Sequence, residues 1–166
     1  MGRASTKSDK SIYQTTREGC GLTREKASEK IGYLSADRIE KIENAKVNVQ
    51  PEDILALAEC YKAPNLCNYY CSQECPIGQQ YIPEIKPKDL SQIAIETLNA
   101  LNRMNREKER LLEIVEDGEI TPDEYADFQE IKKTLDKIVL SVSTLQLWID
   151  QTIADGKIDK NTFDED

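Results

Sequence analysis

Apolar residues recur every three or four positions along most of this chain, which is the spacing of one face of an α-helix. Before residue 75 the pattern comes in four or five short segments, separated by glycine or proline. Two much longer segments follow, over about residues 90–116 and 121–154. The pattern therefore predicts an all-α fold, with a bundle of four to five short helices followed by a long antiparallel helical hairpin.

Capping residues divide the short segments into helices. Thr23 and Ser35 each precede a helix-forming run and are suited to accept from its first free N–H groups. Gly32 ends the run that Thr23 begins, and Pro51 suits the first turn of a later helix. These signals predict helices over residues 12–17, 24–31, 36–44 and 51–61.

The order of residues in this region resembles the phage repressor and Cro-like (XRE) family of helix-turn-helix transcriptional regulators, over roughly residues 9–65. The likeness is carried by Arg17, Gly21-Leu22-Thr23, Glu29, Ile31-Gly32, Ile39, Ile42-Glu43-Asn44, Pro51, Leu55, Leu57 and Ala58. In that family the second helix crosses the DNA backbone and the third lies in the major groove. The resemblance implies contacts to double-stranded DNA from Arg24, Ser35, Ala36, Asp37, Arg38, Lys41 and Lys46. It also implies a structural salt bridge between Arg17 and Glu43, which would join the first helix to the third.

Charge is unevenly distributed along the chain. Residues 1–50 contain ten Lys or Arg and seven Asp or Glu, whereas residues 86–166 contain eleven and nineteen. Only the N-terminal third therefore has the sign that attracts a polyanion. Asp37 and Glu40 nevertheless place two acids on the helix that would approach DNA, and acids repel phosphate. An alternative thus stays open: a protein-interaction or antirepressor-type module that keeps the helix-turn-helix fold without specific DNA binding.

Four of the five cysteines are clustered at the end of the predicted bundle, at Cys60, Cys67, Cys71 and Cys75. If residues 65–74 are helical, the last three fall four residues apart on one stripe. Four thiolates would suit a zinc ion or an iron–sulfur cluster, although six, three and three intervening residues match no standard zinc pattern. The alternative is that these small apolar side chains belong to the core. Cys20 stands apart and is interpreted as structural, and no cofactor is expected to be required.

The second long helix carries an uninterrupted seven-residue repeat, the signature of helices that lie side by side. The stripe consists of Phe128, Ile131, Leu135, Ile138, Val142, Leu145 and Ile149. A looser stripe on the first long helix consists of Leu90, Ala94, Leu101, Met104, Leu111 and Val115. A lone hairpin leaves part of this apolar surface uncovered, and a second copy of the chain is the simplest partner, the alternative being that the surface packs back on the DNA-binding domain. We therefore expect a homodimer whose interface contains Ile131, Leu135, Ile138, Val142, Leu145, Trp148 and Ile149.

These patterns predict five consecutive regions. They are a flexible arm (1–10), a DNA-binding domain with the cysteine cluster at its end (11–75), a proline-containing linker (76–89), a dimerisation hairpin (90–154) and an acidic tail (155–166). The sequence has no stretch long enough to span a bilayer and no signal-peptide core, which favours a cytoplasmic protein. Histidine is absent, and neither a phosphate-binding glycine loop nor a serine nucleophile motif is present. We therefore expect no enzymatic activity and no small-molecule substrate.

Overall fold

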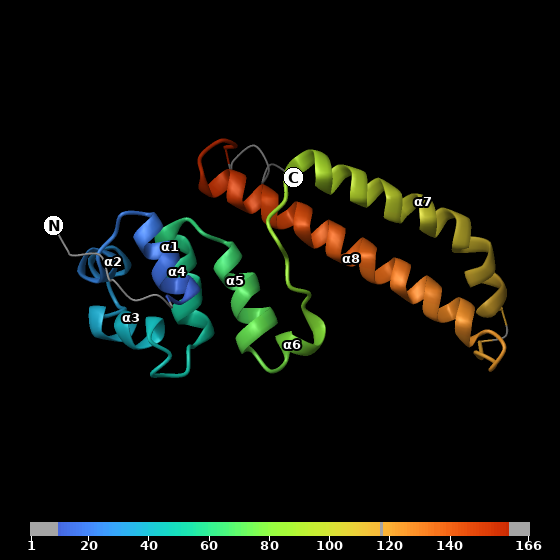
Figure 1. The fold of residues 1–166 in the computed structure, drawn as a ribbon, viewed down its shortest axis with the longest axis horizontal. Coiled ribbons are helices and arrows are strands. Elements are labelled where there is room, and N and C mark those ends of the chain that lie inside the picture. The colour runs from blue at the N-terminus through green and yellow to red at the C-terminus, as the bar shows by residue number, and fades with distance from the viewer. Residues whose placement is uncertain (1–9, 117, 160–166) are drawn as a thin grey trace. The chain divides into compact units, whose positions relative to one another are not determined.

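The computed structural model describes residues 10–116 and 118–159, and this part of the chain contains helices and no strands. The all-α prediction is therefore confirmed, while most of the predicted arm and tail lies outside the described residues. The fold consists of two compact units, one formed by residues 1–84 with 150–166 and the other by residues 85–149. Figure 1 shows the helices in chain order. They are α1 (Ile12–Gly19), α2 (Arg24–Ile31), α3 (Ala36–Glu43), α4 (Pro51–Tyr61), α5 (Asn65–Tyr69), the π-helical turn η1 (Tyr70–Glu74), α6 (Gly78–Tyr81), α7 (Leu90–Ile114) and α8 (Tyr125–Ala154).

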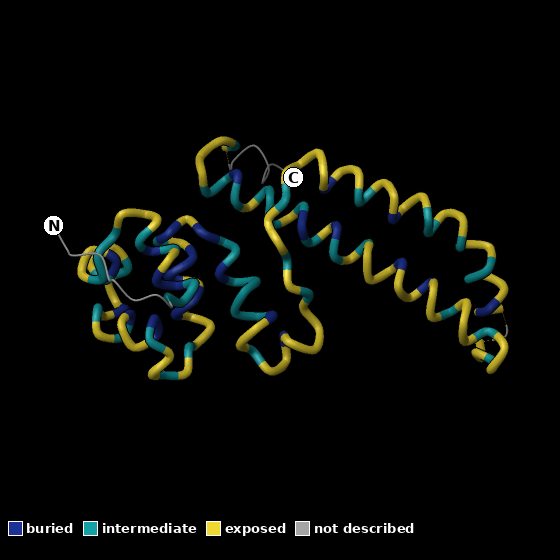
Figure 2. The backbone as a smooth tube through the Cα atoms, in the orientation of Figure 1, coloured by how far each residue is buried: buried dark blue, intermediate teal, exposed yellow. Residues whose placement is uncertain are grey.

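The first unit is built around one apolar core to which α1 to α5 all contribute. Its fully buried side chains come mainly from α3, α4 and α5, and Figure 2 shows where buried positions gather in this part of the chain. They are Ile39, Ile42, Ile54, Leu57 and Leu66. The predicted caps are present, because the hydroxyl of Thr23 accepts from the backbone N–H of Lys26 at 3.2 Å and that of Ser35 from Arg38 at 3.1 Å. Local capping and burial of one helical face thus act together.

The segment after α4 differs in detail from the single helix considered over residues 65–74. It is α-helical only to Tyr69, after which the backbone makes one π turn that ends when the N–H of Cys75 donates to the carbonyl of Tyr70 at 2.9 Å. The following helix α6 lies in the region predicted as a linker. A Cβ on Gly78 would lie 2.0 Å from the carbonyl oxygen of Cys71, so only glycine fits at this close approach of α6 to η1.

The second unit is a two-helix hairpin in which α7 and α8 run antiparallel (Figure 1). Salt bridges join the helices, from Arg103 to Glu130 and from Arg110 Nε to Asp127 Oδ2 at 2.7 Å. The predicted start signal of α8 forms the turn before it, where Thr121 donates its backbone N–H to the Glu124 carboxylate at 3.0 Å. No helix in the described residues is both long and apolar enough to cross a membrane.

The surface that α7 and α8 turn toward each other is narrower and more polar than the predicted stripes. Its buried residues are Ile93, Ala100 and Ile114 on α7 and Ile131, Thr134, Ser141 and Thr144 on α8. Of the predicted α8 stripe only Ile131 is buried, whereas Leu135 and Val142 are 42% and 43% exposed. Leu101 on α7 and Val115 at its C-cap are likewise exposed. Small and hydroxyl-bearing side chains thus occupy several of the facing positions, which leaves much of each apolar stripe outside the contact between the helices.

Candidate nucleic-acid interface

The turn between α2 and α3 sets the orientation of α3 relative to α2. Gly32 ends α2 with φ +86°, a backbone conformation that side chains other than glycine rarely adopt. Leu34 is 4% exposed and anchors the turn in the core, whereas Tyr33 is 70% exposed. The Tyr33 hydroxyl donates to the carbonyl of Glu52 at 3.3 Å, which links the turn to the beginning of α4. One buried and one exposed residue therefore fix the turn from both sides.

A buried carboxylate, that of Glu43, holds α1, α2 and α3 together. Its side chain is only 1% exposed and receives Arg17 Nε at 2.6 Å and Arg17 Nη2 at 3.0 Å. Arg24 Nε donates to the same carboxylate at 2.8 Å. Arg17 also donates from Nη1 to the carbonyl of Leu22 at 2.6 Å. Burial acts to lower the pKa of Arg17, but the hydrogen bonds to Glu43 and the charge attraction of Glu43, with smaller contributions from Tyr61 and Glu18, together outweigh it and raise the pKa, so the guanidinium stays charged.

The salt bridge implied between Arg17 and Glu43 is thus present, and Arg24 shares it. The position of Arg24 has a consequence for its implied phosphate contact. Its guanidinium faces Glu43 and lies 3.8 Å from Glu40, although the side chain keeps 28% of its surface exposed. Arg24 Nε therefore binds the buried Glu43 carboxylate, while part of the Arg24 side chain stays exposed to solvent.

Arg38 of α3 is also engaged within the domain. Its Nε and Nη2 donate to Asp53 Oδ2 at 3.2 and 2.6 Å, and Nη2 donates to the carbonyl of Asn48 at 3.1 Å. Asp53 in turn accepts from the backbone N–H of Gln50 at 3.2 Å as part of the cap of α4. Arg38 therefore ties α3 to the start of α4, a structural role that the sequence pattern did not indicate.

The outward face of α3 combines acids with one lysine. Ser35, Asp37, Glu40 and Lys41 are exposed, and Ala36 is half-buried. Lys41 Nζ lies 2.7 Å from Asp37 Oδ2, one helical turn away. Lys46 is exposed beyond the end of α3, where its backbone N–H donates to the carbonyl of Lys41 at 2.8 Å. The structure thus places the residues implied for DNA contact around α3, with their cations largely paired to neighbouring acids.

Two further cations lie on α2 and were missed by the sequence reasoning. Lys26 and Lys30 are exposed, and neither forms a salt bridge with any residue that the structure describes. Their four-residue spacing, which places both on one side of the helix, was the available signal. These ammonium groups add positive charge to the helix that crosses the DNA backbone in the resembling family.

The cysteines are distributed between two places in the first unit. Cys60 packs toward α2, where its Sγ lies 4.0 Å from the carbonyl of Ala27, and Cys20 Sγ donates to the carbonyl of Tyr61 at 3.1 Å. Burial raises the pKa of Cys60; the charge of Lys30 opposes this rise, and interaction with nearby Cys20 adds to it. Cys67 has a pKa raised first by burial and then by Cys71. Cys60 thus has Cys20 as its neighbouring thiol, and Cys67 has Cys71.

At the end of the π turn, Cys75 Sγ accepts from the backbone N–H of Gly78 at 3.5 Å. Across residues 10–116 and 118–159, no three Cys, Asp or Glu side chains are arranged to hold one metal ion. The π turn contributes to this arrangement, because beyond Tyr69 the four-residue spacing no longer follows an α-helical stripe. Metal binding by Cys60, Cys67, Cys71 and Cys75 stays a prediction.

Comparison with known proteins bears on the first unit. Residues 14–66 match a protein family described as a helix-turn-helix domain. No curated protein and no solved structure matches the chain. The matched segment begins in α1 and ends in α5, so it includes the turn at Gly32, the Glu43 carboxylate and α3. Residues 14–66 of this chain are a helix-turn-helix domain.

Proposed function

We propose that the protein is a sequence-specific DNA-binding transcriptional regulator of the XRE type, which acts in the cytoplasm as a dimer joined by the helical hairpin. The observation that carries the proposal is the exposed polar face of α3, held rigidly by Glu43 and Arg38 within a matched helix-turn-helix domain. A reading helix needs this combination, because base edges are recognised by side chains whose backbone is fixed in position. Catalysis is no part of the proposal.

Phosphate contacts are assigned to the lysines around the reading helix. Lys26 and Lys30 on α2 and Lys46 after α3 are exposed, so their ammonium groups are available to the DNA backbone. Ser35, Asp37 and Lys41 are assigned to base edges. A carboxylate in the major groove accepts from the amino group of cytosine, which gives Asp37 a role in discrimination despite its charge.

The positions of exposed apolar side chains on the hairpin support dimerisation through it. Leu101 of α7 and Val115 at its C-cap each follow a buried residue by one position, as do Leu135 and Val142 of α8. One position turns a side chain by about 100° around a helix. Two antiparallel helices are related by a two-fold axis perpendicular to the plane that contains both. A rotation of the same size and sense away from the buried line therefore brings side chains of both helices to the same face of the hairpin. These four exposed apolar side chains therefore share one face, which a second copy would bury.

The DNA-binding proposal is tested by selection from a randomised duplex library, followed by affinity measurements for the selected site across a salt series. We expect a two-fold symmetric site and an affinity that falls as salt rises. Replacing Lys46 by alanine should weaken binding and reduce the salt slope by about one. Lys133→Ala in the hairpin removes the same charge and should leave both values unchanged. Failure to enrich any sequence would refute specific DNA binding.

The dimer is tested by light scattering after size-exclusion chromatography. Val139 is 54% exposed and lies one turn from both Leu135 and Val142. Val139→Glu should therefore give a monomer if the apolar face is the interface. Asn102→Glu adds a carboxylate at another exposed position of the hairpin and serves as the matched control. Equal masses for both variants and the parent protein would contradict this choice of interface.

A second candidate function, a protein-interaction module that keeps the helix-turn-helix fold, is favoured by the charge of α3. The side chains of Asp37 and Glu40 are 72% and 48% exposed, while Arg38 is held by Asp53. Such a face would suit a basic protein partner. Under this hypothesis, Asp37→Asn and Glu40→Gln together should strengthen non-specific DNA binding and weaken partner capture. Under the preferred hypothesis the same variant should instead change which sequences are selected.

A further inference from the structure

The hairpin contains a cavity that the proposed DNA-binding role does not use. It has a volume of about 860 Å³ and lies between the middle of α7 and the facing part of α8. Its size falls within the range of small-molecule sites, roughly 300–1,000 Å³. Ten residues line it: Glu96, Asn99, Ala100, Asn102, Arg103, Asn105, Arg106, Lys137, Leu140 and Ser141. All of them belong to the unit formed by residues 85–149.

The charge of the cavity wall is opposite to that of the hairpin around it. Residues 85–149 contain nine Lys or Arg and thirteen Asp or Glu. Three of those nine cations, Arg103, Arg106 and Lys137, line the cavity, where only one acid is present. That acid, Glu96, is itself engaged, because Lys88 Nζ donates to its Oε2 at 2.5 Å and Gln92 to its Oε1 at 3.0 Å. Among the residues that line the cavity, cations therefore outnumber acids by three to one.

The three cations differ in how they are held. Arg103 is fixed by salt bridges to Glu107, with Nε 2.8 Å from Oε1, and to Glu130 on α8. Arg106 and Lys137, by contrast, form no salt bridge with any residue in the described part of the chain. Salt bridges thus fix the orientation of Arg103, whereas the guanidinium of Arg106 and the ammonium of Lys137 remain available to a ligand.

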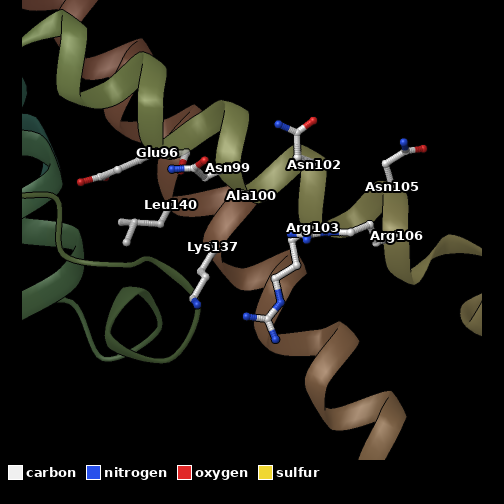
Figure 3. Close-up of a pocket in the computed structure, with 10 residues that line it drawn as sticks. Glu96, Asn99, Ala100, Asn102, Arg103, Asn105, Arg106, Lys137 and Leu140 are labelled. Atoms are coloured by element: carbon white, nitrogen blue, oxygen red, sulfur yellow. The ribbon is translucent and has the colours of Figure 1, made fainter.

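The side chains that converge come from both helices. Figure 3 shows Arg103 of α7 and Lys137 of α8 projecting to the same side of the hairpin, whereas Asn102 and Asn105 project away from them. Ala100 and Ser141, both buried, form the floor between the helices, and Leu140 adds an apolar wall. The site is thus concave, with cations from α7 and α8 placed around small buried residues. Such a site suits a negatively charged group attached to a small organic molecule.

We propose that this cavity binds a small, multiply charged oxyanion, carried by a phosphorylated or polycarboxylated metabolite, through Arg103, Arg106 and Lys137. Arginine donates paired N–H groups that match the oxygens of phosphate and carboxylate, and the lysine adds a compact positive charge. Asn99 and the Ser141 hydroxyl supply neutral hydrogen bonds at the same wall. Binding at this site does not depend on DNA recognition by α3, so either proposal can fail without the other.

The test is a titration of the isotope-labelled full chain with pyrophosphate, inorganic phosphate or citrate, at constant ionic strength adjusted with potassium chloride. Amide signals of residues 99–106 and 137–141, with the side-chain amide of Asn99, should shift in a saturable manner. Pyrophosphate and citrate distinguish a phosphorylated ligand from a polycarboxylate, and calorimetry gives their affinities. The absence of saturable shifts in this region with all three anions, up to about 10 mM, would overturn the proposal.

The control compares two double variants that each remove two positive charges, one inside the cavity and one outside it. Arg106→Gln with Lys137→Gln should weaken anion binding by about tenfold or more, since each cation makes a charge-assisted hydrogen bond. Lys108→Gln with Lys133→Gln removes the same charge from positions that do not line the cavity. Equal weakening in both double variants would mean non-specific attraction and would overturn the site. So would a loss of duplex DNA affinity confined to the cavity variant, because the cations would then be backbone contacts.

Discussion

Replacing Glu43 by alanine should strongly destabilise the helix-turn-helix domain. The substitution removes the acceptor of three guanidinium hydrogen bonds, two from Arg17 and one from Arg24. The Arg17 side chain is 7% exposed, so its charge would remain buried without a partner. Breaking one side of a buried pair costs about 3–5 kcal/mol, against a total stability of about 5–15 kcal/mol for a typical domain. Arg24 contributes less to this cost, because it is partly exposed and water can solvate it.

The assay is urea unfolding followed by two probes. The only tryptophan, Trp148, lies in the hairpin unit, so its fluorescence reports mainly on that unit, whereas far-UV circular dichroism reports on all helices. Glu43→Ala should shift part of the circular dichroism transition to lower urea and leave the fluorescence transition in place. Lys41→Ala, which breaks the exposed pair with Asp37, should cost only about 0–1 kcal/mol and is the control.

A double variant tests how much of the lost stability comes from leaving the buried Arg17 charge without a partner. Arg17→Met combined with Glu43→Met replaces the buried pair by apolar side chains and should recover much of the lost stability, because such replacements are often nearly neutral. Recovery should be incomplete, since the carbonyl of Leu22 also loses its donor. If Glu43→Ala left the free energy of unfolding within about 0.5 kcal/mol of the parent, the buried carboxylate would not hold the bundle together and the reasoning would be refuted.

Three other predictions follow from single contacts. Arg38→Ala should lower both stability, by about 1–3 kcal/mol, and DNA affinity, whereas Lys41→Ala should lower affinity alone; urea unfolding and binding assays on the same samples separate the two effects. Gly78→Ala should cost about 1–3 kcal/mol or more in thermal unfolding, because its Cβ would meet a backbone carbonyl at 2.0 Å, while Gly19→Ala, with open space around it, should cost almost nothing. If the four clustered cysteines bind metal, protein purified without oxygen should contain zinc or iron in about equimolar amount or more, and less than about one tenth of a metal per chain would contradict that prediction.

The short helices were predictable because their signals are local. Thr23, Ser35 and Gly32 act within a few residues of their own positions, and the structure places helix boundaries beside them. The roles of the charged residues depended instead on contacts far apart in sequence. Arg38 reads from sequence as an exposed cation on a recognition helix, yet its partner Asp53 lies fifteen residues away on another helix. No helical periodicity encodes such a pair.

The hairpin illustrates a different limit of sequence reasoning. The heptad stripe of α8 marks which side chains are apolar, but it does not say which neighbour covers them. Thr134 and Ser141 occupy the buried line, and Leu135 and Val142 lie one position further round the helix. A helix contact that uses small and hydroxyl-bearing residues leaves the larger apolar side chains for another surface. The sequence pattern therefore showed which side chains of α8 are apolar, but it did not show which residues of α8 contact α7.

The internal salt bridges determine which cations remain for DNA. Releasing Arg38 would leave the carboxylate of Asp53, whose side chain is 11% exposed, without its strongest partner. Releasing Lys41 from Asp37 costs little, because both side chains are about half exposed or more. DNA contacts should therefore come first from Lys41 and from the lysines of α2 and the α3–α4 loop, namely Lys26, Lys30 and Lys46. The three phosphate contacts assigned to Lys26, Lys30 and Lys46 would give a salt slope of about −2.7 for each half-site, and a slope near zero would mean that these lysines do not face the duplex.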